Sequence, residues 1–259
     1  MPRFAANLSM MFTDAPFLQR FERAALAGFR AVEFLFPYDY SPGEVTQAAR
    51  AVGVEVVLFN TVPGDWSKGE RGLAAQPGRE EAFRAGVAKA LEYADALGCR
   101  QIHAMAGLVA EGADRDAMRA TYIENLRHAA EAAGKTGVTV LIEPINTRDI
   151  PGFFLNHTEE AAAIIAEVGA PNLKLQFDIY HRQIMQGDLT PAIERHLPLI
   201  AHMQVADTPG RNEPGTGEIN YPFLFEAIDR LGYQGWIGCE YRPQGETEAG
   251  LGWFAPYRG

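Results

Sequence analysis

Short apolar runs alternate with amphipathic segments along nearly the whole chain. Most of the runs are almost wholly apolar, as in Val138–Ile142, which is typical of parallel strands covered by helices. They predict eight strands, at Arg3–Ser9, Ala31–Phe36, Glu55–Asn60, Arg100–Ala106, Val138–Ile145, Leu173–Tyr180, Ile200–Ala206 and Gly235–Tyr241.

The segments between these runs have apolar residues spaced near the helical period. They predict helices at Pro16–Ala27, Pro42–Ala51, Arg79–Leu97, Arg115–Ala133, Thr158–Val168, Leu189–His196 and Pro222–Leu231. No linker rich in Pro, Gly or Ser divides the alternation, so we expect one domain over residues 1–259. Eight strand–helix units in one undivided chain predict an α/β fold, a single (β/α)8 TIM barrel. No glycine-rich phosphate turn follows the first strand, which argues against a doubly wound sheet.

Two connections are longer than most strand-to-helix loops. They are Thr61–Gly78 and Asn146–His157. Because the loops that follow the strands line the catalytic face of such a barrel, we expect both to border the active site as lids.

Charge and cysteine content narrow the class of partner. The chain has 23 Lys and Arg against 33 Asp and Glu, a net charge of −10, which argues against nucleic acid or an anionic membrane as a partner. Cys99 and Cys239 stand alone, so neither a zinc motif nor a disulfide framework is expected. The sequence contains no long apolar segment and no signal peptide at its start, and we expect a cytoplasmic protein.

Four polar residues end four consecutive predicted strands. They are Glu143, Asp178, Gln204 and Glu240. A lone ionised carboxylate among apolar residues would cost several kcal/mol, and three that converge would also repel one another. One divalent cation would resolve both problems, and ligands that are all oxygen favour Mg²⁺ or Mn²⁺ over Zn²⁺. The alternative is that each acid is an isolated residue paired with an Arg or Lys.

The same pattern indicates a chemistry. Two glutamates that face each other across a metal ion, Glu143 and Glu240, are suited to moving a proton between adjacent carbons. His181 is expected to bind a substrate oxygen, with a structural role as its alternative. His103 is expected either in the core or in the pocket wall.

Two arginines are candidates for binding a substrate carboxylate, because a guanidinium matches that group. Arg211 follows the seventh predicted strand, and its alternative role is an ion pair with Glu213 or another loop acid. Arg71 lies in the first long loop, and its alternative is a solvated surface charge.

Several motifs together resemble the hydroxypyruvate isomerase family of the xylose-isomerase-like barrels. The motifs are Glu143-Pro-Ile-Asn, Asp178-Ile-Tyr-His, Gln204, Gly210-Arg-Asn-Glu-Pro-Gly-Thr-Gly-Glu-Ile-Asn-Tyr, Gly64-Asp-Trp with Gly69-Glu-Arg-Gly-Leu-Ala, and Gly235-Trp-Ile-Gly-Cys-Glu-Tyr. The resemblance covers essentially the whole chain. It implies a TIM barrel with one divalent metal ion on Glu143, Asp178, Gln204 and Glu240, and with Glu143 and Glu240 as the proton-transfer pair.

The resemblance also implies an activity, the interconversion of hydroxypyruvate and tartronate semialdehyde, and close relatives isomerise 2-oxo-tetronates. The related ketose 3-epimerases usually carry His at the position of Gln204, so this chain departs from them. A metal-dependent endonuclease barrel would need His-rich metal positions and a basic track, and a non-catalytic binding barrel would not need both glutamates. The substrate is therefore expected to be a small oxo or hydroxy acid. The aromatic segment Trp253–Tyr257 is expected to pack on a second copy, in a homo-oligomer, or to close the barrel floor.

Overall fold

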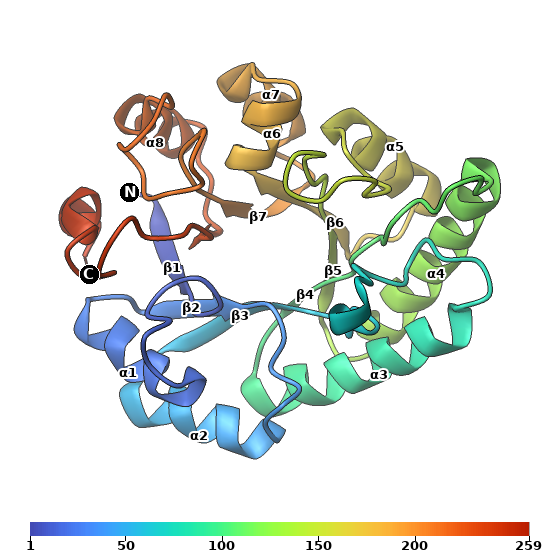
Figure 1. The fold of residues 1–259 in the computed structure, drawn as a ribbon, viewed down its shortest axis with the longest axis horizontal. Coiled ribbons are helices and arrows are strands. Elements are labelled where there is room, and N and C mark those ends of the chain that lie inside the picture. The colour runs from blue at the N-terminus through green and yellow to red at the C-terminus, as the bar shows by residue number, and fades with distance from the viewer. Residues whose placement is uncertain (259) are drawn as a thin grey trace.

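Eight parallel strands close into a barrel in chain order, with β1 beside β8 (Figure 1). The computed structural model describes residues 1–258, so Gly259, the last residue of the predicted domain, lies outside the described residues. The strands are β1 (Arg3–Asn7), β2 (Ala31–Phe34), β3 (Glu55–Asn60), β4 (Gln101–His103), β5 (Thr139–Ile142), β6 (Leu173–Asp178), β7 (Ile200–Gln204) and β8 (Trp236–Cys239). The predicted (β/α)8 barrel is confirmed.

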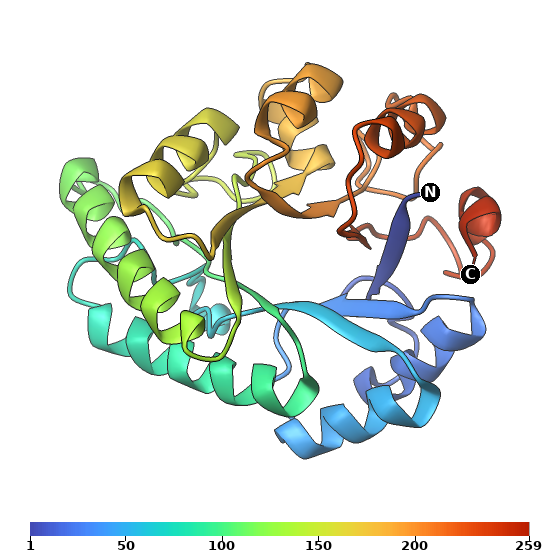
Figure 2. The ribbon, with the colours of Figure 1, turned by 180° about the vertical axis from the view of Figure 1, so that it is seen from behind.

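The helices surround the barrel (Figure 2). They are α1 (Phe17–Leu26), α2 (Pro42–Val52), α3 (Glu80–Leu97), α4 (Arg115–Gly134), α5 (Thr158–Val168), α6 (Ile179–Met185), α7 (Leu189–His196) and α8 (Tyr221–Arg230), with short 3₁₀ helices η1 (Trp66–Lys68) and η2 (Leu251–Tyr257). Among the described residues, none of these helices is both long and apolar enough to cross a membrane.

Local sequence explains where the helices begin and end. At the start of α2, Ser41 and Glu44 form a reciprocal capping box, in which each side chain accepts a hydrogen bond from the other residue's backbone N–H. The helix ends at Gly53, which adopts the left-handed conformation that glycine allows at no steric cost.

Seven of the eight predicted strands are longer than the observed ones, and after one of them a helix was missed. The strand predicted to reach Tyr180 ends at Asp178, and α6 begins at the next residue. The Asp178 carboxylate accepts the backbone N–H groups of Tyr180 at 2.7 Å and of His181 at 3.2 Å. It therefore caps the helix, and this cap turns the chain out of the strand.

The aromatic segment near the end of the chain lies in the ring of helices that surrounds the barrel. η2 occupies the gap in the ring of helices between α8 and α1 (Figure 1). There Phe4 of β1 contacts Trp253 and Tyr257, each at 5.1 Å between ring centroids, and Phe29 stacks on Phe254 at 4.2 Å. The predicted closure of the floor is wrong, because η2 takes the place of the helix that would follow β8.

Candidate active site

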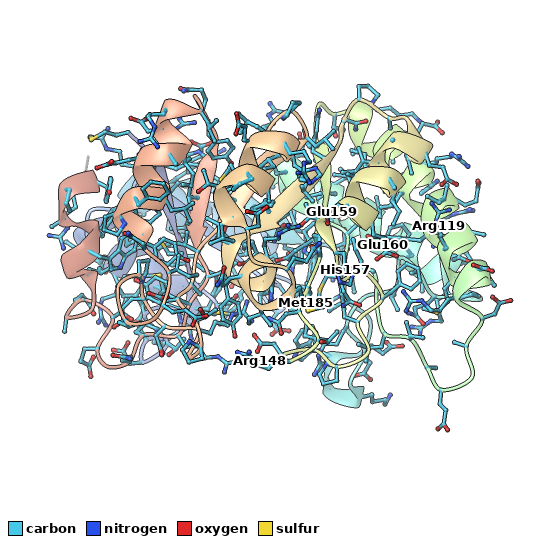
Figure 3. The ribbon with its side chains drawn as sticks, turned by 90° about the horizontal axis from the view of Figure 1, so that it is seen from above. Arg119, Arg148, His157, Glu159, Glu160 and Met185 are labelled. Carbon is cyan, nitrogen blue, oxygen red and sulfur yellow. The ribbon has the colours of Figure 1, made fainter. Side chains whose placement is uncertain are left out.

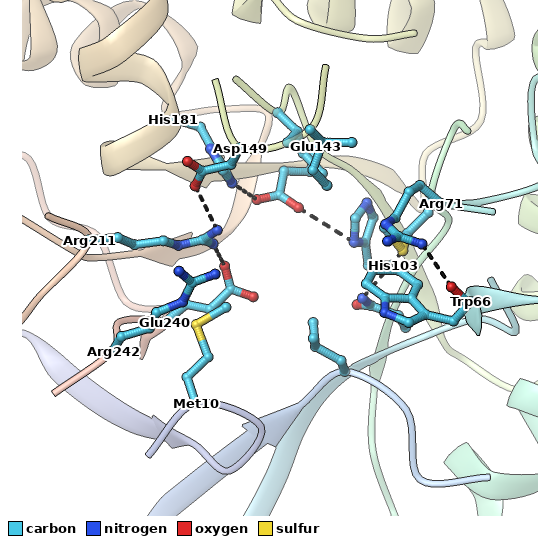
Figure 4. Close-up of a pocket in the computed structure, with 15 residues that line it drawn as sticks. Met10, Trp66, Arg71, His103, Glu143, Asp149, His181, Arg211, Glu240 and Arg242 are labelled. Carbon is cyan, nitrogen blue, oxygen red and sulfur yellow. Dashed lines mark hydrogen bonds and ion pairs between the residues drawn. The ribbon is translucent and has the colours of Figure 1, made fainter. Parts of the chain in front are cut away.

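A cavity of about 300 Å³ opens at the carboxyl ends of the strands, and each of the eight strands, or the loop or helix directly after it, contributes to its wall (Figure 4). Its lining residues are Met10, Leu35, Asn60, Trp66, Arg71, His103, Met105, Glu143, Ile145, Asp149, Ile150, His181, Arg211, Glu240 and Arg242. A cavity of this size suits a small molecule.

Both long loops reach this cavity, as expected. Trp66 and Arg71 come from the loop after β3, and Asp149 comes from the loop after β5. The first loop lies directly against the backbone at the end of β4, because a Cβ atom at Gly72 would stand 2.3 Å from the carbonyl oxygen of Met105. Gly72 also has a φ of +121°, which only glycine adopts readily.

Four buried side chains meet at the base of the cavity. Glu143, Asp178, His181 and Glu240 each offer one ligand atom, and these atoms lie within 4.8 Å of one another. One oxygen of Glu143 and one of Asp178 are buried without a hydrogen-bond partner. Buried carboxylate oxygens that lack a donor are a fit for a hard divalent cation, which would satisfy them. The residues present therefore suit a metal ion.

Burial and mutual repulsion dominate the electrostatics of these acids. Burial raises the pKa of Asp178 to about 6 and that of Glu240 to about 8, while the nearby Arg211 opposes both shifts. The pKa of Glu143 is raised well above its usual range by burial, and the charges of Glu240 and Asp178 add to this effect. Without a cation, the cluster therefore tends to hold protons at neutral pH.

The protonated nitrogen of His181 follows from its neighbour Asn146. The Asn146 Oδ1 accepts the backbone N–H groups of Arg148 at 2.9 Å and Asp149 at 2.7 Å, so its Nδ2 faces His181 Nδ1 at 2.6 Å. Burial, Arg211 and His103 lower the pKa of His181 well below its usual value. The neutral ring must accept at Nδ1 and therefore carries its proton on Nε2.

This tautomer decides what His181 can do. Its Nε2 lies 3.8 Å from Glu143 Oε1 and 3.7 Å from Asp178 Oδ2. A nitrogen that carries a proton donates a hydrogen bond and has no lone pair for a metal ion. The other predicted histidine, His103, lines the cavity with Nδ1 at 3.6 Å from Glu143, and burial lowers its pKa to about 3. Its place is the pocket wall.

The two predicted arginines have different surroundings (Figure 4). Arg211 forms ion pairs with Glu240 and with Asp149, the latter at 3.0 Å. The alternative role, an ion pair with a loop acid, is confirmed, although that acid is Asp149 and not Glu213. Arg71 stacks on the indole of Trp66, 3.9 Å from the ring centroid, and donates to the backbone oxygens of Trp66 and Glu70. Within residues 1–258 no carboxylate lies within 4.0 Å of Arg71.

Gln204 lies beside Asp178 on the neighbouring strand. It is buried and does not reach the wall of the cavity, because its side chain is bonded to two other buried residues. Its Nε2 donates to Glu33 at 2.8 Å, and its Oε1 accepts from Gln176 at 2.7 Å.

Sequence reasoning missed Asp149 and Arg242 in the wall of the cavity, and it missed Glu33 and Asn146, which contact Gln204 and His181. Glu33 had a detectable signal, since it is the single charged residue in the apolar run Ala31–Phe36. The other three lie in connecting segments, where no periodic pattern marks a side chain that points into a pocket.

The chain matches the family model described as xylose isomerase-like TIM barrel over residues 21–257. It is 59% identical over 259 residues to a protein from Cupriavidus necator named 2-oxo-tetronate isomerase, and 52% identical over 258 residues to one from Escherichia coli K12 named hydroxypyruvate isomerase. Each match covers 100% of both chains. A crystal structure from Brucella melitensis, described as an AP endonuclease of family 2, is similar at 53% identity with a TM-score of 0.98, also over 100% of each chain.

The chain therefore belongs to the xylose isomerase-like TIM-barrel family. The predicted resemblance is confirmed. So is the prediction of an isomerase, because full-length relatives at 52% and 59% identity carry isomerase names.

The buried acids predict that the metal-free protein loses stability as the pH rises. The pKa values of Asp178 and Glu240, about 6 and about 8, lie above their ordinary values of 3.8 and 4.5. Between about pH 4 and pH 8 the folded state then binds more protons than the unfolded state. The free energy of unfolding is therefore largest near pH 4 and falls as the pH rises toward 8. Thermal unfolding with chelator should show a falling Tm across this range.

A divalent cation should oppose that loss, because it neutralises the ionised carboxylates. The gap between the Tm with Mn²⁺ and the Tm with chelator should therefore widen from pH 5 to pH 8. In Glu240→Gln, which lacks the group that titrates near pH 8, the chelator curve should flatten at its upper end. A gap that stays constant with pH would contradict the interpretation.

Proposed function

We propose that the protein is a metal-dependent isomerase of short hydroxy and oxo carboxylic acids, with the conversion of hydroxypyruvate to tartronate semialdehyde (2-hydroxy-3-oxopropanoate) as its reaction. The observation that carries the proposal is the pair of buried glutamates, Glu143 and Glu240, in the wall of one small cavity beside Asp178. The name of the Cupriavidus necator relative favours a second candidate substrate of the same class, a 2-oxo-tetronate.

The proposed ligands of the cation, Mg²⁺ or Mn²⁺, are Glu143, Asp178, Gln204 and Glu240. The unpartnered oxygens of Glu143 and Asp178 support this set, as does the position of Gln204 next to Asp178. When bound, a divalent cation stabilises the negative charge that develops on the substrate oxygens.

The proposed chemistry is a proton transfer between neighbouring carbons. One glutamate, as a carboxylate, removes a proton from the hydroxymethyl carbon, and the electron pair of that C–H bond forms the enediolate. The other, as a carboxylic acid, returns a proton to the former keto carbon, while a proton moves from the hydroxyl oxygen to the keto oxygen. His181 donates a hydrogen bond from its Nε2–H to a substrate oxygen, which fits the tautomer imposed by Asn146.

We assign the substrate carboxylate to Arg71. Arg211 is occupied by Glu240 and Asp149, so its charge is already balanced, and its role is to hold Glu240 in place. Arg71 has no such partner in the described part of the chain, and the Trp66 ring and two backbone carbonyls hold its guanidinium in place. Arg242 also lines the cavity, but its side chain is exposed and without such support.

Two rival functions fit less well. A ketose 3-epimerase would use an uncharged sugar, which leaves the Arg71 guanidinium without an anion to bind. An endonuclease must bind a polyanion, whereas this chain carries a net charge of −10, and its cavity of about 300 Å³ suits a smaller molecule.

Proton NMR with hydroxypyruvate and, separately, with a 2-oxo-tetronate tests the function directly. The protein should convert at least one acid to its isomer, lose this activity in chelator, and regain it with Mg²⁺ or Mn²⁺. Free ketopentoses and ketohexoses are the comparison substrates. Efficient epimerisation of a sugar without turnover of either acid would refute the proposal.

Glu143→Gln and Glu240→Gln should each reduce kcat by roughly 10²–10⁴-fold, the usual contribution of a general acid or base. The amide keeps the size of the side chain but cannot exchange the proton, so circular dichroism should show an intact fold. Glu159→Gln is a matched control, because Glu159 lies on α5 outside the cavity and pairs with Arg182 (Figure 3). This control should keep wild-type kcat, and substantial activity in either active-site variant would contradict the assignment.

Arg71→Met should raise KM for the acid by about 10- to 100-fold, because a hydrogen-bonded pair between charged groups contributes roughly 1.5–3 kcal/mol. Affinity for Mn²⁺ should stay the same. Arg148→Met provides the control, since Arg148 is exposed on the loop that carries Asp149 and does not line the cavity (Figure 3). An unchanged KM in the Arg71 variant would exclude Arg71 as the carboxylate-binding residue.

A further inference from the structure

A second cluster of buried polar residues lies inside the barrel, and the proposed mechanism leaves its central residue unused. Glu33 of β2 is 1% exposed, and it lies opposite Asn7 of β1 in the sheet register. Around its carboxyl group are side chains from β1 and β7, all of them buried. A carboxylate in such a place is retained only if its partners satisfy it fully.

Every partner of Glu33 is a donor. Its Oε1 accepts from Asn7 Nδ2 at 2.9 Å and from Gln204 Nε2 at 2.8 Å. Its Oε2 lies 2.6 Å from His202 Nε2, which donates because an ionised carboxylate only accepts. The group is therefore held by three hydrogen bonds, two on one oxygen and one on the other.

The backbone of β8 makes room for this carboxyl group. A Cβ atom at Gly238 would stand 2.2 Å from Glu33 Oε2. Gly238 also neighbours Gln204 in the register of β7 and β8. The absence of a side chain at position 238 thus allows Glu33 to lie across the barrel interior against β8.

Contact with Glu33 fixes the orientation of the Gln204 amide. Because Glu33 only accepts, the edge of the amide that faces it must be Nε2, and Oε1 is turned to the other side. There Oε1 accepts one hydrogen bond, from Gln176 Nε2 at 2.7 Å. An amide oxygen has two lone pairs, so one remains for a further partner.

We propose that Glu33 is a positioning residue that holds Gln204 with its oxygen available to the divalent cation. The inference rests on the proposed function, since it takes Gln204 as a ligand. Without Glu33 the contact with Gln176 is the hydrogen bond that remains on the amide. The Gln176 amide can turn as well, because its own oxygen has no partner in the described structure, so Gln204 can then present its NH₂ group, which cannot bind a cation. Residues that orient a ligand in this way typically change metal affinity by 10- to 100-fold when they are removed.

The test measures Mn²⁺ affinity by titration, followed by electron paramagnetic resonance of free Mn²⁺, so it does not depend on activity. Glu33→Ala should weaken binding by about 10- to 100-fold. Glu33→Gln should restore most of the affinity. Its remaining oxygen can face the two donors Asn7 and Gln204, while its NH₂ faces His202, which can accept by moving its proton to Nδ1, an atom without a partner in the described structure.

A double-mutant cycle separates positioning from a general effect of charge. Gln204→Leu should weaken Mn²⁺ binding to a similar extent as Glu33→Ala. If Glu33 acts through Gln204, the double variant should bind within about threefold of the Gln204→Leu variant. If the two losses multiply instead, Glu33 acts on the ion through its charge, and the proposal is overturned.

Gly238→Ala offers a second route if the Glu33→Ala protein does not fold. Its methyl group should displace the Glu33 carboxyl group and weaken Mn²⁺ binding, whereas Gly245→Ala, where nothing lies within 4 Å of the added Cβ, should bind as wild type does. Wild-type protein that binds no Mn²⁺ would refute the proposed function itself. Tight binding by wild type, by folded Glu33→Ala and by Gly238→Ala would refute only the role of Glu33.

Discussion

Three carboxyl groups share the base of one cavity, where there is little water to solvate them and where each repels the others. This arrangement constrains the surrounding structure. Arg211 balances part of the charge through Glu240 and Asp149, and it does so from a backbone conformation with φ of +56° that non-glycine residues rarely adopt. One oxygen of Glu143 and one of Asp178 still lack a hydrogen-bond donor, and these two oxygens are suited to binding a cation. The ion pairs and the missing donors both follow from the burial of these acids.

The fold could be predicted because each layer of a barrel leaves a periodic trace in the sequence. Strands buried on both faces give apolar runs, and helices that cover them give a period near 3.6. The prediction failed where a single side chain ended an element. Nothing in the periodicity distinguishes Asp178 as a strand residue from Asp178 as a helix cap, so α6 was missed. The position of Trp253–Tyr257 depended on a gap between α8 and α1 that only the assembled ring reveals.

The site was predictable to the extent that its residues interrupt apolar runs. Glu143, Asp178 and Glu240 do so, and the structure brings them together with His181. Glu33 interrupts its run in the same way, and its carboxyl group meets Gln204 across the barrel. An ion pair of Arg211 with a loop acid could be predicted, but not which acid, because Asp149 lies 62 positions earlier in the chain, in a loop without a pattern. Contacts of that kind depend on the fold and cannot be read from local sequence.

Glycine at position 238 has a consequence for how this barrel can vary. The volume that a methyl group would need there is filled by the carboxyl group of Glu33. Glu33 lies on β2, about 200 positions earlier in the sequence. The two positions therefore share one volume. A larger residue at 238 becomes acceptable only when residue 33 is shortened, and a barrel redesigned at either position must change both together. Side-chain size, as well as charge, therefore couples position 238 in the barrel wall to Glu33 and, through Glu33, to Gln204.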